Sequence, residues 1–531
     1  MTTYDYIIVG AGAAGCVLAD RLTEDPSVRV LVLEFGGRAG NPLLYIPKGF
    51  YFTLQGDRYC YHYPTQPVGP GGRPESWTRG KVGGGSTSVN GMMYIRGARA
   101  DYDAIVERGN PGWGWQDMLP VFRTMEDHDL GPSASRGAGG PLGVSITAQD
   151  DLVCDAILGA GRKMGLRQTA DFNEDDDERI GFTPSTIKHG IRVSAASAFL
   201  RRAAKRPNLT VLYRTRVGYL RFDGNRVAGV RAKTGPSYQD YTAAREVIVS
   251  AGTVESTLLL ERSGIGRPET LAAAGVTVRV ESPNLGERVI EQRGVSMQVK
   301  LKGRIGLTHK LNTVPKQGLQ GARYLLTRRG PIATAGYDLV CAGKSSAALD
   351  RPDIQGIWLP MALDTRADKM KLAKYSGAMF VGYQVRPTTR SQVHISGSLP
   401  ENAPVISPRF LETPEDRAAT SRILDWGREM VAQSPLADLV EAEDRPGPSV
   451  STPDEVINHA IAGPLGIYHA IGSCAMGPNA EDVVDHRLRV RGVDGLRVID
   501  ASVFAEQPAG NTAAPTMALA WRAGDLIREE R

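Results

Sequence analysis

The stretch from Tyr4 to Glu34 constrains the fold more than any other part of the chain. A β-branched apolar run leads into the pattern Gly-x-Gly-x-x-Gly, formed by Gly10, Gly12 and Gly15, and a second apolar run ends on Glu34. This order predicts a strand, a tight turn, a helix and a second strand, with the acid placed to bind a ribose hydroxyl. The N-terminus of such a helix offers unpaired N–H groups and a positive dipole end to phosphates. We therefore expect the chain to open with a dinucleotide-binding fold.

Length and charge limit the remaining possibilities. With 531 residues the chain exceeds what one hydrophobic core usually serves, so we expect at least two domains. A net charge of +5 is small for this length and gives no ground for nucleic acid or an anionic membrane as partner. No apolar run approaches the roughly 20 residues that span a bilayer, and no secretory leader precedes Tyr4. The five cysteines are scattered, without a Cys-x-x-Cys pair, so neither disulfides nor a metal site is indicated. These features predict a cytoplasmic protein.

A second glycine-rich segment favours a bound anionic or flat group, and a strand and helix start near the end of the chain favour an anion. Gly83, Gly84 and Gly85 are followed by small hydroxyl residues, a pattern that brings the backbone close to a ligand, with a flexible linker as the alternative. Near the end of the chain a strand-like run ends on an acid. After it, Asn511 or Thr512 can cap a helix that runs to about residue 529.

The region from residue 294 to about 443 has a different character. Strand-like pieces at 296–301, 355–360 and 378–386 alternate with turns, and no phosphate-binding pattern occurs among them. We expect this region to form most of a substrate domain. Farther upstream, Asp223-Gly224-Asn225 predicts a hairpin turn within the first domain.

Taken together, four separated motifs resemble the glucose–methanol–choline (GMC) family of flavin oxidoreductases. They are the opening fingerprint, the run 80–90, the run 252–266, and the C-terminal segments 468–477 and 500–512. The resemblance covers nearly the whole chain. It departs at Glu291-Gln292, where the family commonly shows Asp-His, and we assign no function to that pair.

The resemblance implies an α/β fold, with a Rossmann-like FAD-binding domain and a second α+β substrate domain built on an antiparallel sheet. The FAD-binding domain would comprise residues 1–150, 206–293 and 464–531, and the substrate domain residues 151–205 and 294–463. FAD would be bound non-covalently, because Val89 stands where some relatives attach it through a histidine. The residues implied to hold FAD are Gly10, Gly12, Ala13, Ala14, Gly15, Glu34, Val82, Ser86, Asn90, Gly91, Met92, Met93, Val217, Ala251, Asp500, Ala501, Asn511 and Thr512.

Alcohol oxidation needs a base for the hydroxyl proton and an acceptor for hydride. A histidine near its usual pKa of about 6.5 suits the first task. Most of the eight histidines are expected to be structural, but His469 precedes a Gly-Ser turn and matches the catalytic position of the family. Asn511 would hold the substrate oxygen as negative charge develops on it. The hypothesis is that His469 deprotonates a primary alcohol while hydride passes to flavin N5.

The substrate and the electron acceptor are left open at this stage. Tyr468 and Trp358 would form an aromatic wall for aryl or furanic alcohols, while an ordinary core position is the alternative for Trp358. Electrons would pass to dioxygen or to a quinone-like acceptor. Two alternative functions are a hydroxynitrile lyase on the same flavin fold and a non-catalytic flavin-binding protein.

Overall fold

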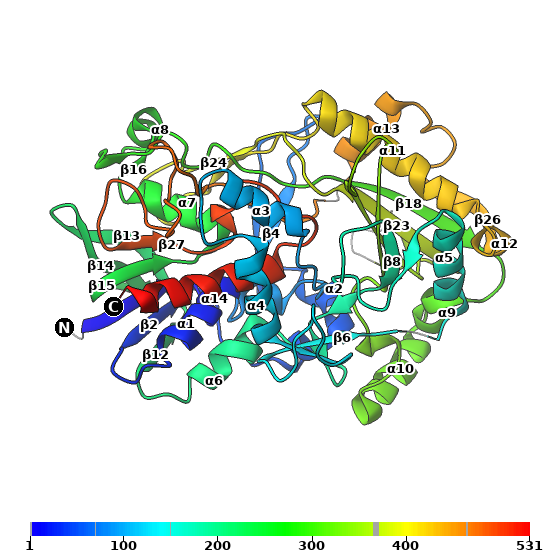
Figure 1. The fold of residues 1–531 in the computed structure, drawn as a ribbon, viewed down its shortest axis with the longest axis horizontal. Helices are drawn as coiled ribbons and strands as arrows, with labels where there is room; N and C mark the ends of the chain where they lie inside the picture. The colour runs from blue at the N-terminus through cyan, green and yellow to red at the C-terminus, as the bar shows by residue number, and fades with distance from the viewer. Residues whose placement is uncertain (1–2, 70, 149, 365–370, 464–465, 531) are drawn as a thin grey trace.

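The computed structural model describes residues 3–69, 71–148, 150–364, 371–463 and 466–530. The ribbon divides into two halves that lie side by side, each built around one large sheet (Figure 1). Both chain ends lie in the half that contains β1, which we call the first half. The predicted boundary at residue 464 falls outside the described residues.

The first half opens with the predicted strand–helix–strand unit. β1 (Thr3–Val9) leads through Gly10 into α1 (Ala13–Leu22), and β2 (Val30–Glu34) pairs with β1 in parallel. β12 (Leu209–Tyr213) and β15 (Ser237–Val249) extend this parallel arrangement on either side. All five residues of β2 are buried, as expected for a parallel sheet covered on both faces. The predicted Rossmann-like fold is confirmed.

Segments from the middle and the end of the chain complete this sheet. β13 (Thr215–Asp223) and β14 (Arg226–Thr234) form an antiparallel hairpin at the predicted turn, and β14 pairs with β15. β27 (Leu496–Val498) then joins β15 in parallel, and α14 (Ala513–Glu529) packs along α1 (Figure 1). The C-terminal segment of the chain therefore packs against the N-terminal strand–helix–strand unit.

The second half contains the predicted sheet, which is antiparallel except for one parallel pair of short strands at its edge. Three neighbouring strands in it are β18 (Gly294–Leu301), β23 (Gly377–Gln384) and β20 (Ile354–Leu359), and both of their pairings are antiparallel. The remaining strands of this sheet are β7 (Arg167–Gln168), β8 (Arg179–Phe182), β19 (Leu339–Gly343) and β26 (Val440–Arg445). α5 (Leu152–Lys163), α11 (Pro414–Val431) and α13 (Pro453–Ala462) pack against it.

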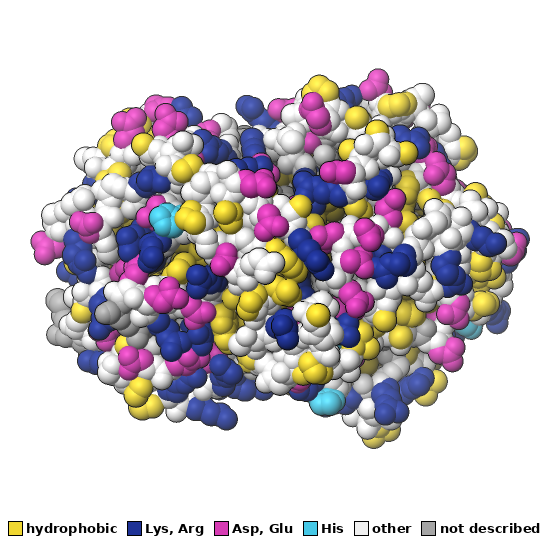
Figure 2. Space-filling view, viewed as in Figure 1, with side chains coloured by type: hydrophobic (Ala, Val, Ile, Leu, Met, Phe, Trp, Pro, Cys, Tyr) yellow, Lys and Arg dark blue, Asp and Glu magenta, His cyan; other side chains and the backbone are white. Residues whose placement is uncertain are grey.

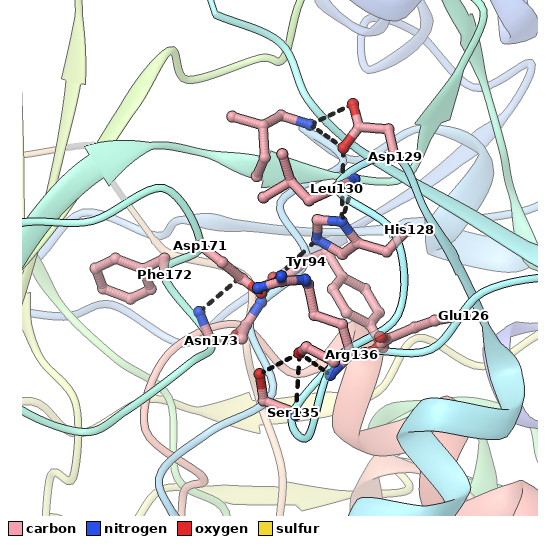
Figure 3. A network of polar contacts seen from close by, with 12 residues as sticks. Tyr94, Glu126, His128, Asp129, Leu130, Ser135, Arg136, Asp171, Phe172 and Asn173 are labelled. Carbon is pink, nitrogen blue, oxygen red and sulfur yellow. Dashed lines mark hydrogen bonds and ion pairs between the residues drawn. The ribbon is translucent and has the colours of Figure 1, made fainter.

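A buried charged network lies close to the segment that follows Met93. The Arg96 guanidinium makes two hydrogen bonds to the Glu126 carboxylate, at 2.8 and 2.6 Å, and the Tyr94 hydroxyl donates to the same carboxylate at 2.6 Å. Asp171 lies beside both His128 and Arg136 (Figure 3). We call this cluster the Glu126 network: Tyr94, Arg96, Glu126, His128, Arg136 and Asp171.

The surface carries charges of both signs. Lys, Arg, Asp and Glu side chains are mixed over most of the face shown in Figure 2, in line with the small net charge. Within the described part of the chain, no helix is both long and apolar enough to cross a membrane. Nor do the described His, Cys, Asp and Glu side chains form a group of three or more that could hold a metal ion.

Candidate active site

A cavity of about 330 Å³ extends from the glycine turn after β1 to His469 and Asn511. Side chains and backbone from all the predicted motifs line it. The predicted residues among them are Gly10, Gly12, Ala13, Ala14, Glu34, Ser86, Asn90, Gly91, Met92, Met93, Val217, Ala251, Tyr468, His469, Asp500, Ala501, Asn511 and Thr512. Motifs that are hundreds of residues apart in the chain therefore meet at one site.

Three predicted residues lie outside the cavity lining. A Cβ at Gly15 would come within 1.9 Å of the Gly10 carbonyl oxygen, so this glycine allows close packing between helix and turn. Val82 is buried in a small apolar cluster with Val89. Trp358 is fully buried in the second half and packs on Phe380, with ring centroids 5.0 Å apart. Trp358 thus occupies the core position that was the alternative for it.

The two glycine-rich turns approach each other at one end of the cavity. Gly10 has a φ of +100°, which side chains disfavour, and a Cβ at Gly85 would lie 2.8 Å from the Gly12 Cα. The Gly84 N–H donates to the Ala11 carbonyl at 2.7 Å. α1 starts at this point without a side-chain cap, so its first N–H groups are available to an anion. This end fits the pyrophosphate of a dinucleotide.

Two buried carboxylates hold the walls of the cavity in place. Glu34 accepts hydrogen bonds from the backbone N–H groups of Ala11 and Gly36 at 2.8 and 2.6 Å, and burial raises its pKa. Asp500 accepts from the Gly252 N–H at 2.8 Å and from the Ser256 hydroxyl at 2.6 Å. Both carboxylates therefore tie the ends of the parallel strands to the turns that follow them.

A buried arginine that sequence reasoning did not single out supports the second glycine-rich segment. Arg192 is 2% exposed and donates to the Thr87 carbonyl at 3.3 Å and to Oδ1 of Asn90 at 3.0 Å. Burial without a nearby carboxylate lowers the pKa of Arg192 to about 9. Because Asn90 lines the cavity, Arg192 fixes the orientation of an amide at the wall.

His469 is held in one orientation by a side-chain amide. Its Nδ1 lies 2.7 Å from Oε1 of Gln292, and Nε2 of Gln292 donates to the Val385 carbonyl at 2.9 Å. Because this second bond determines which end of the Gln292 amide faces the ring, Nδ1 carries the proton and Nε2 keeps a lone pair. The neutral imidazole therefore presents a proton acceptor toward the cavity.

The second half orients Asn511 in the same manner. Nε2 of Gln355, on β20, donates to Oδ1 of Asn511 at 3.1 Å and to the Tyr383 hydroxyl at 2.6 Å. Nδ2 of Asn511 is thereby turned to Nε2 of His469, 3.0 Å away. Gln292, His469, Asn511, Gln355 and Tyr383 form one hydrogen-bonded series without formal charge, which we call the amide chain.

The surroundings of His469 keep the ring neutral. Burial, together with the positive charge of Arg79, lowers the pKa of His469 to about 3. The Glu291 carboxylate accepts from the backbone N–H groups of His469 and Ala470 at 2.8 and 3.1 Å and pairs with Arg79 at 3.3 Å. The sequence assigns no function to Glu291 and Gln292, yet both contact His469. The departure from the family pattern at this pair was the available signal.

α14 adds a positive dipole end to the same region. The structure starts this helix after Thr512, and neither of the two predicted caps is made, since Thr512 forms no side-chain cap and the Asn511 side chain belongs to the amide chain. The first N–H groups of α14 consequently lack a capping side chain at the cavity wall, where Ala513 lies. A negative charge near Asn511 would be stabilised by them.

Comparisons with known proteins agree with this geometry. Residues 4–292 and 387–520 match two family models that are both described as GMC oxidoreductase. An oxygen-dependent choline dehydrogenase of Photobacterium profundum is 36% identical, over 99% of this chain and 93% of the relative. An alcohol dehydrogenase [acceptor] of Pseudomonas putida is 33% identical, over 99% and 95%. The solved structure of pyridoxine 4-oxidase from Mesorbium loti superposes with a TM-score of 0.89 at 29% identity, over 99% of this chain and 100% of that one.

Proposed function

The chain belongs to the GMC oxidoreductase family, which makes it an FAD-dependent alcohol oxidoreductase, and on this premise we propose that it oxidises a primary alcohol to an aldehyde with His469 as base. The observation that supports this most is the pair formed by His469 Nε2 and Asn511 Nδ2. These two atoms lie 3.0 Å apart in the lining of a cavity whose other end fits a dinucleotide. A proton acceptor and a hydrogen-bond donor at one point are what an alcohol oxygen requires.

The chain's own residues handle the proton and the charge on oxygen. Nε2 of His469 takes the hydroxyl proton, while Gln292 accepts from Nδ1–H and keeps the ring in place. Nδ2 of Asn511 donates to the substrate oxygen as negative charge develops on it, aided by the positive end of α14. Bound FAD supplies the acceptor for the hydride that leaves the alcohol carbon. Loss of one proton and one hydride leaves the aldehyde.

The walls near His469 favour alcohols with an apolar or aromatic group. Phe50, Tyr337, Ile467 and Tyr468 line this part of the cavity, and Tyr468 is 44% exposed. Such side chains bind apolar surface and leave the hydroxyl group to His469 and Asn511. Relatives are named for choline and for alcohols with an unspecified acceptor. We propose dioxygen or a quinone-like compound as the electron acceptor.

Anaerobic titration tests this proposal. A panel of primary alcohols is added to the FAD-loaded protein, and the visible absorption of the flavin is followed. Aryl or other apolar alcohols are expected to bleach it, and the rate at which colour returns in air separates dioxygen from other acceptors. Substrate turnover without any bleaching would contradict the proposal and favour a lyase. Acid precipitation should release all the flavin, because Val89 offers no attachment site.

A further inference from the structure

One helix of the second half leaves its apolar side uncovered. α10 (Val314–Thr327) protrudes at the lower right of the molecule beside α9 (Gly306–Leu311) (Figure 1). All 14 residues of α10 are described, and only Tyr324 is buried, where its hydroxyl donates to the Gly190 carbonyl at 3.0 Å. By contrast, Leu319 is 67% and Leu326 85% exposed. Large apolar side chains that gather on one exposed surface mark a site of interaction.

The spacing places these leucines on the side of α10 opposite Tyr324. At 3.6 residues per turn, Leu319, Ala322 and Leu326 lie about half a turn of the helix away from Tyr324. Val314 and Leu325, 80% and 65% exposed, border the same side. α10 thus contacts the protein through Tyr324 and through Lys316 and Gln317, which donate to carbonyls of α9, and it directs an apolar side outward. In Figure 2, hydrophobic and basic side chains appear together at the tip of the molecule where α10 lies.

All the charged residues in the sequence around α10 are basic. From Lys300 to Tyr337 there is no Asp or Glu, and the cations in this interval are Lys300, Lys302, Arg304, Lys310, Lys316, Arg323, Arg328 and Arg329. Lys310 pairs with Asp151 and Lys300 with Asp444, whereas the four cations from Lys316 to Arg329 form no ion pair within the described part of the chain. The small net charge of the whole chain therefore conceals a strong local excess.

We propose that α10 lies in the interface of a lipid bilayer that contains anionic lipids, with Leu319 and Leu326 inserted among the acyl chains. A helix with an exposed apolar side and basic residues along its border matches interfacial helices that lie parallel to a membrane. The unpaired Arg323 and Arg329 then meet the negative headgroups. A second copy of this chain suits the surface less well, because a symmetric contact would bring the same basic residues together.

This proposal goes beyond the expectation from the overall charge, which gave no ground for an anionic membrane. α10 is close to the cavity lining in sequence, since Tyr337, which lines the cavity, follows the end of α10 by ten residues. η5 (Pro331–Ala333) lies between α10 and Tyr337 in the chain.

Co-sedimentation of the FAD-loaded protein with vesicles tests the proposal. We expect binding to phosphatidylcholine vesicles with about 30% phosphatidylglycerol, clearly weaker binding to phosphatidylcholine alone, and weaker binding at high salt. The double variant Leu319→Glu/Leu326→Glu should bind at least about tenfold less. Arg323→Gln/Arg329→Gln should lose about tenfold on anionic vesicles and little on neutral ones.

Leu399→Glu is the matched control, because Leu399 is 55% exposed next to Ser398, which contacts Tyr219 on β13 of the first half. It should bind like the unaltered protein, and all variants should keep their activity with a soluble acceptor. Failure of the unaltered protein to sediment with anionic vesicles would overturn the proposal, as would equal loss in the control. If instead the leucine variant converts a dimer to a monomer in lipid-free sedimentation and vesicles bind neither, α10 is a contact between copies and not a membrane site.

Discussion

The amide chain and the Glu126 network are both buried and polar, but they are built on opposite principles. Around Glu126, the Tyr94 hydroxyl, the Arg96 guanidinium and the Gly137 N–H all donate to one carboxylate, so its acceptor positions are filled. The hydrogen-bond partners of the His469 ring within the described residues are neutral amides, Gln292 at Nδ1 and Asn511 at Nε2. One cluster is charged and its carboxylate is filled by several donors, whereas the other is uncharged and its acceptor nitrogen meets a neutral amide.

The difference separates stability from reactivity. A buried ion pair whose partners are satisfied is expensive to break, so the Glu126 network anchors the segment after Met93. A neutral amide chain lets a proton arrive at His469 without a compensating movement of other charges, since only one group changes its charge. Removing a charge from one cluster should therefore affect stability, and changing a group in the other should affect reactivity. The variants below are given in order of expected effect.

His469→Ala removes the base from the amide chain and should slow flavin reduction by about 10²- to 10⁴-fold, because positioned proton transfer contributes that much. Stopped-flow absorbance under anaerobic conditions measures this rate, and FAD content should stay unchanged. His486→Ala is the matched control, since His486 is half-buried and outside the cavity lining. A reduction rate near that of the control would remove His469 from the mechanism.

Arg96→Met leaves Glu126 buried without its cation and should lower the free energy of unfolding by about 3–5 kcal/mol. Urea unfolding followed by far-ultraviolet circular dichroism measures this change. The fraction that remains folded should reduce its flavin at nearly the normal rate. Adding Glu126→Leu should recover part of the stability, because no unpaired carboxylate is then buried. A larger loss in the double variant would show that the pair is not the source of the effect.

Gln292→Glu brings a charge into the amide chain. The carboxylate would accept from Nδ1–H and raise the pKa of His469, so the ring becomes protonated at a higher pH. The acid limb of the pH profile for flavin reduction should move to higher pH by one unit or more. Gln292→Leu should instead reduce the rate about tenfold at every pH without moving the limb. Identical profiles for both variants would mean that Gln292 has only a packing role.

His394 supplies a smaller contrast, since it lies between two carboxylates rather than two amides. Burial lowers its pKa, but the hydrogen bond to Glu261 at 2.7 Å and the nearby Glu287 outweigh burial, and the net direction is upward. Because the pKa of His394 is higher in the folded than in the unfolded protein, its protonation stabilises the fold. This stabilisation is complete below the unfolded-state pKa of about 6.5 and is lost as pH rises through the folded-state pKa.

His394→Gln should therefore cost on the order of 1 kcal/mol at pH 6 and much less at pH 9. Thermal unfolding at a series of pH values measures the difference from the unaltered protein. His469, with a lowered pKa, should show the opposite sign, so that His469→Gln gains relative stability as pH falls below about 6.5. If the stability difference from the unaltered protein changed with pH in the same direction for both variants, the opposite pKa shifts of the two histidines would be contradicted.

The sequence predicted those parts of the site that depend on local patterns. The strand, turn and helix around Gly10, and the acid at Glu34, follow from spacing within one short segment. Gln292 and Gln355 carry no such pattern, since their partners His469 and Asn511 lie far along the chain and only the folded sheet brings them together. Trp358 was an ambiguous prediction for a related reason, because a strand alternates between two faces and the sequence does not say which one meets the cavity.

The return of β27 and α14 to the first half affects how the protein is made. Asn511 and the start of α14 follow the strands of both large sheets in the chain, so a growing polypeptide contains those strands before it contains this wall of the cavity. Domains generally fold as units during synthesis, but here the first half needs segments that are synthesised after the second half. The cavity wall at Asn511 can therefore form only after the second half has been synthesised.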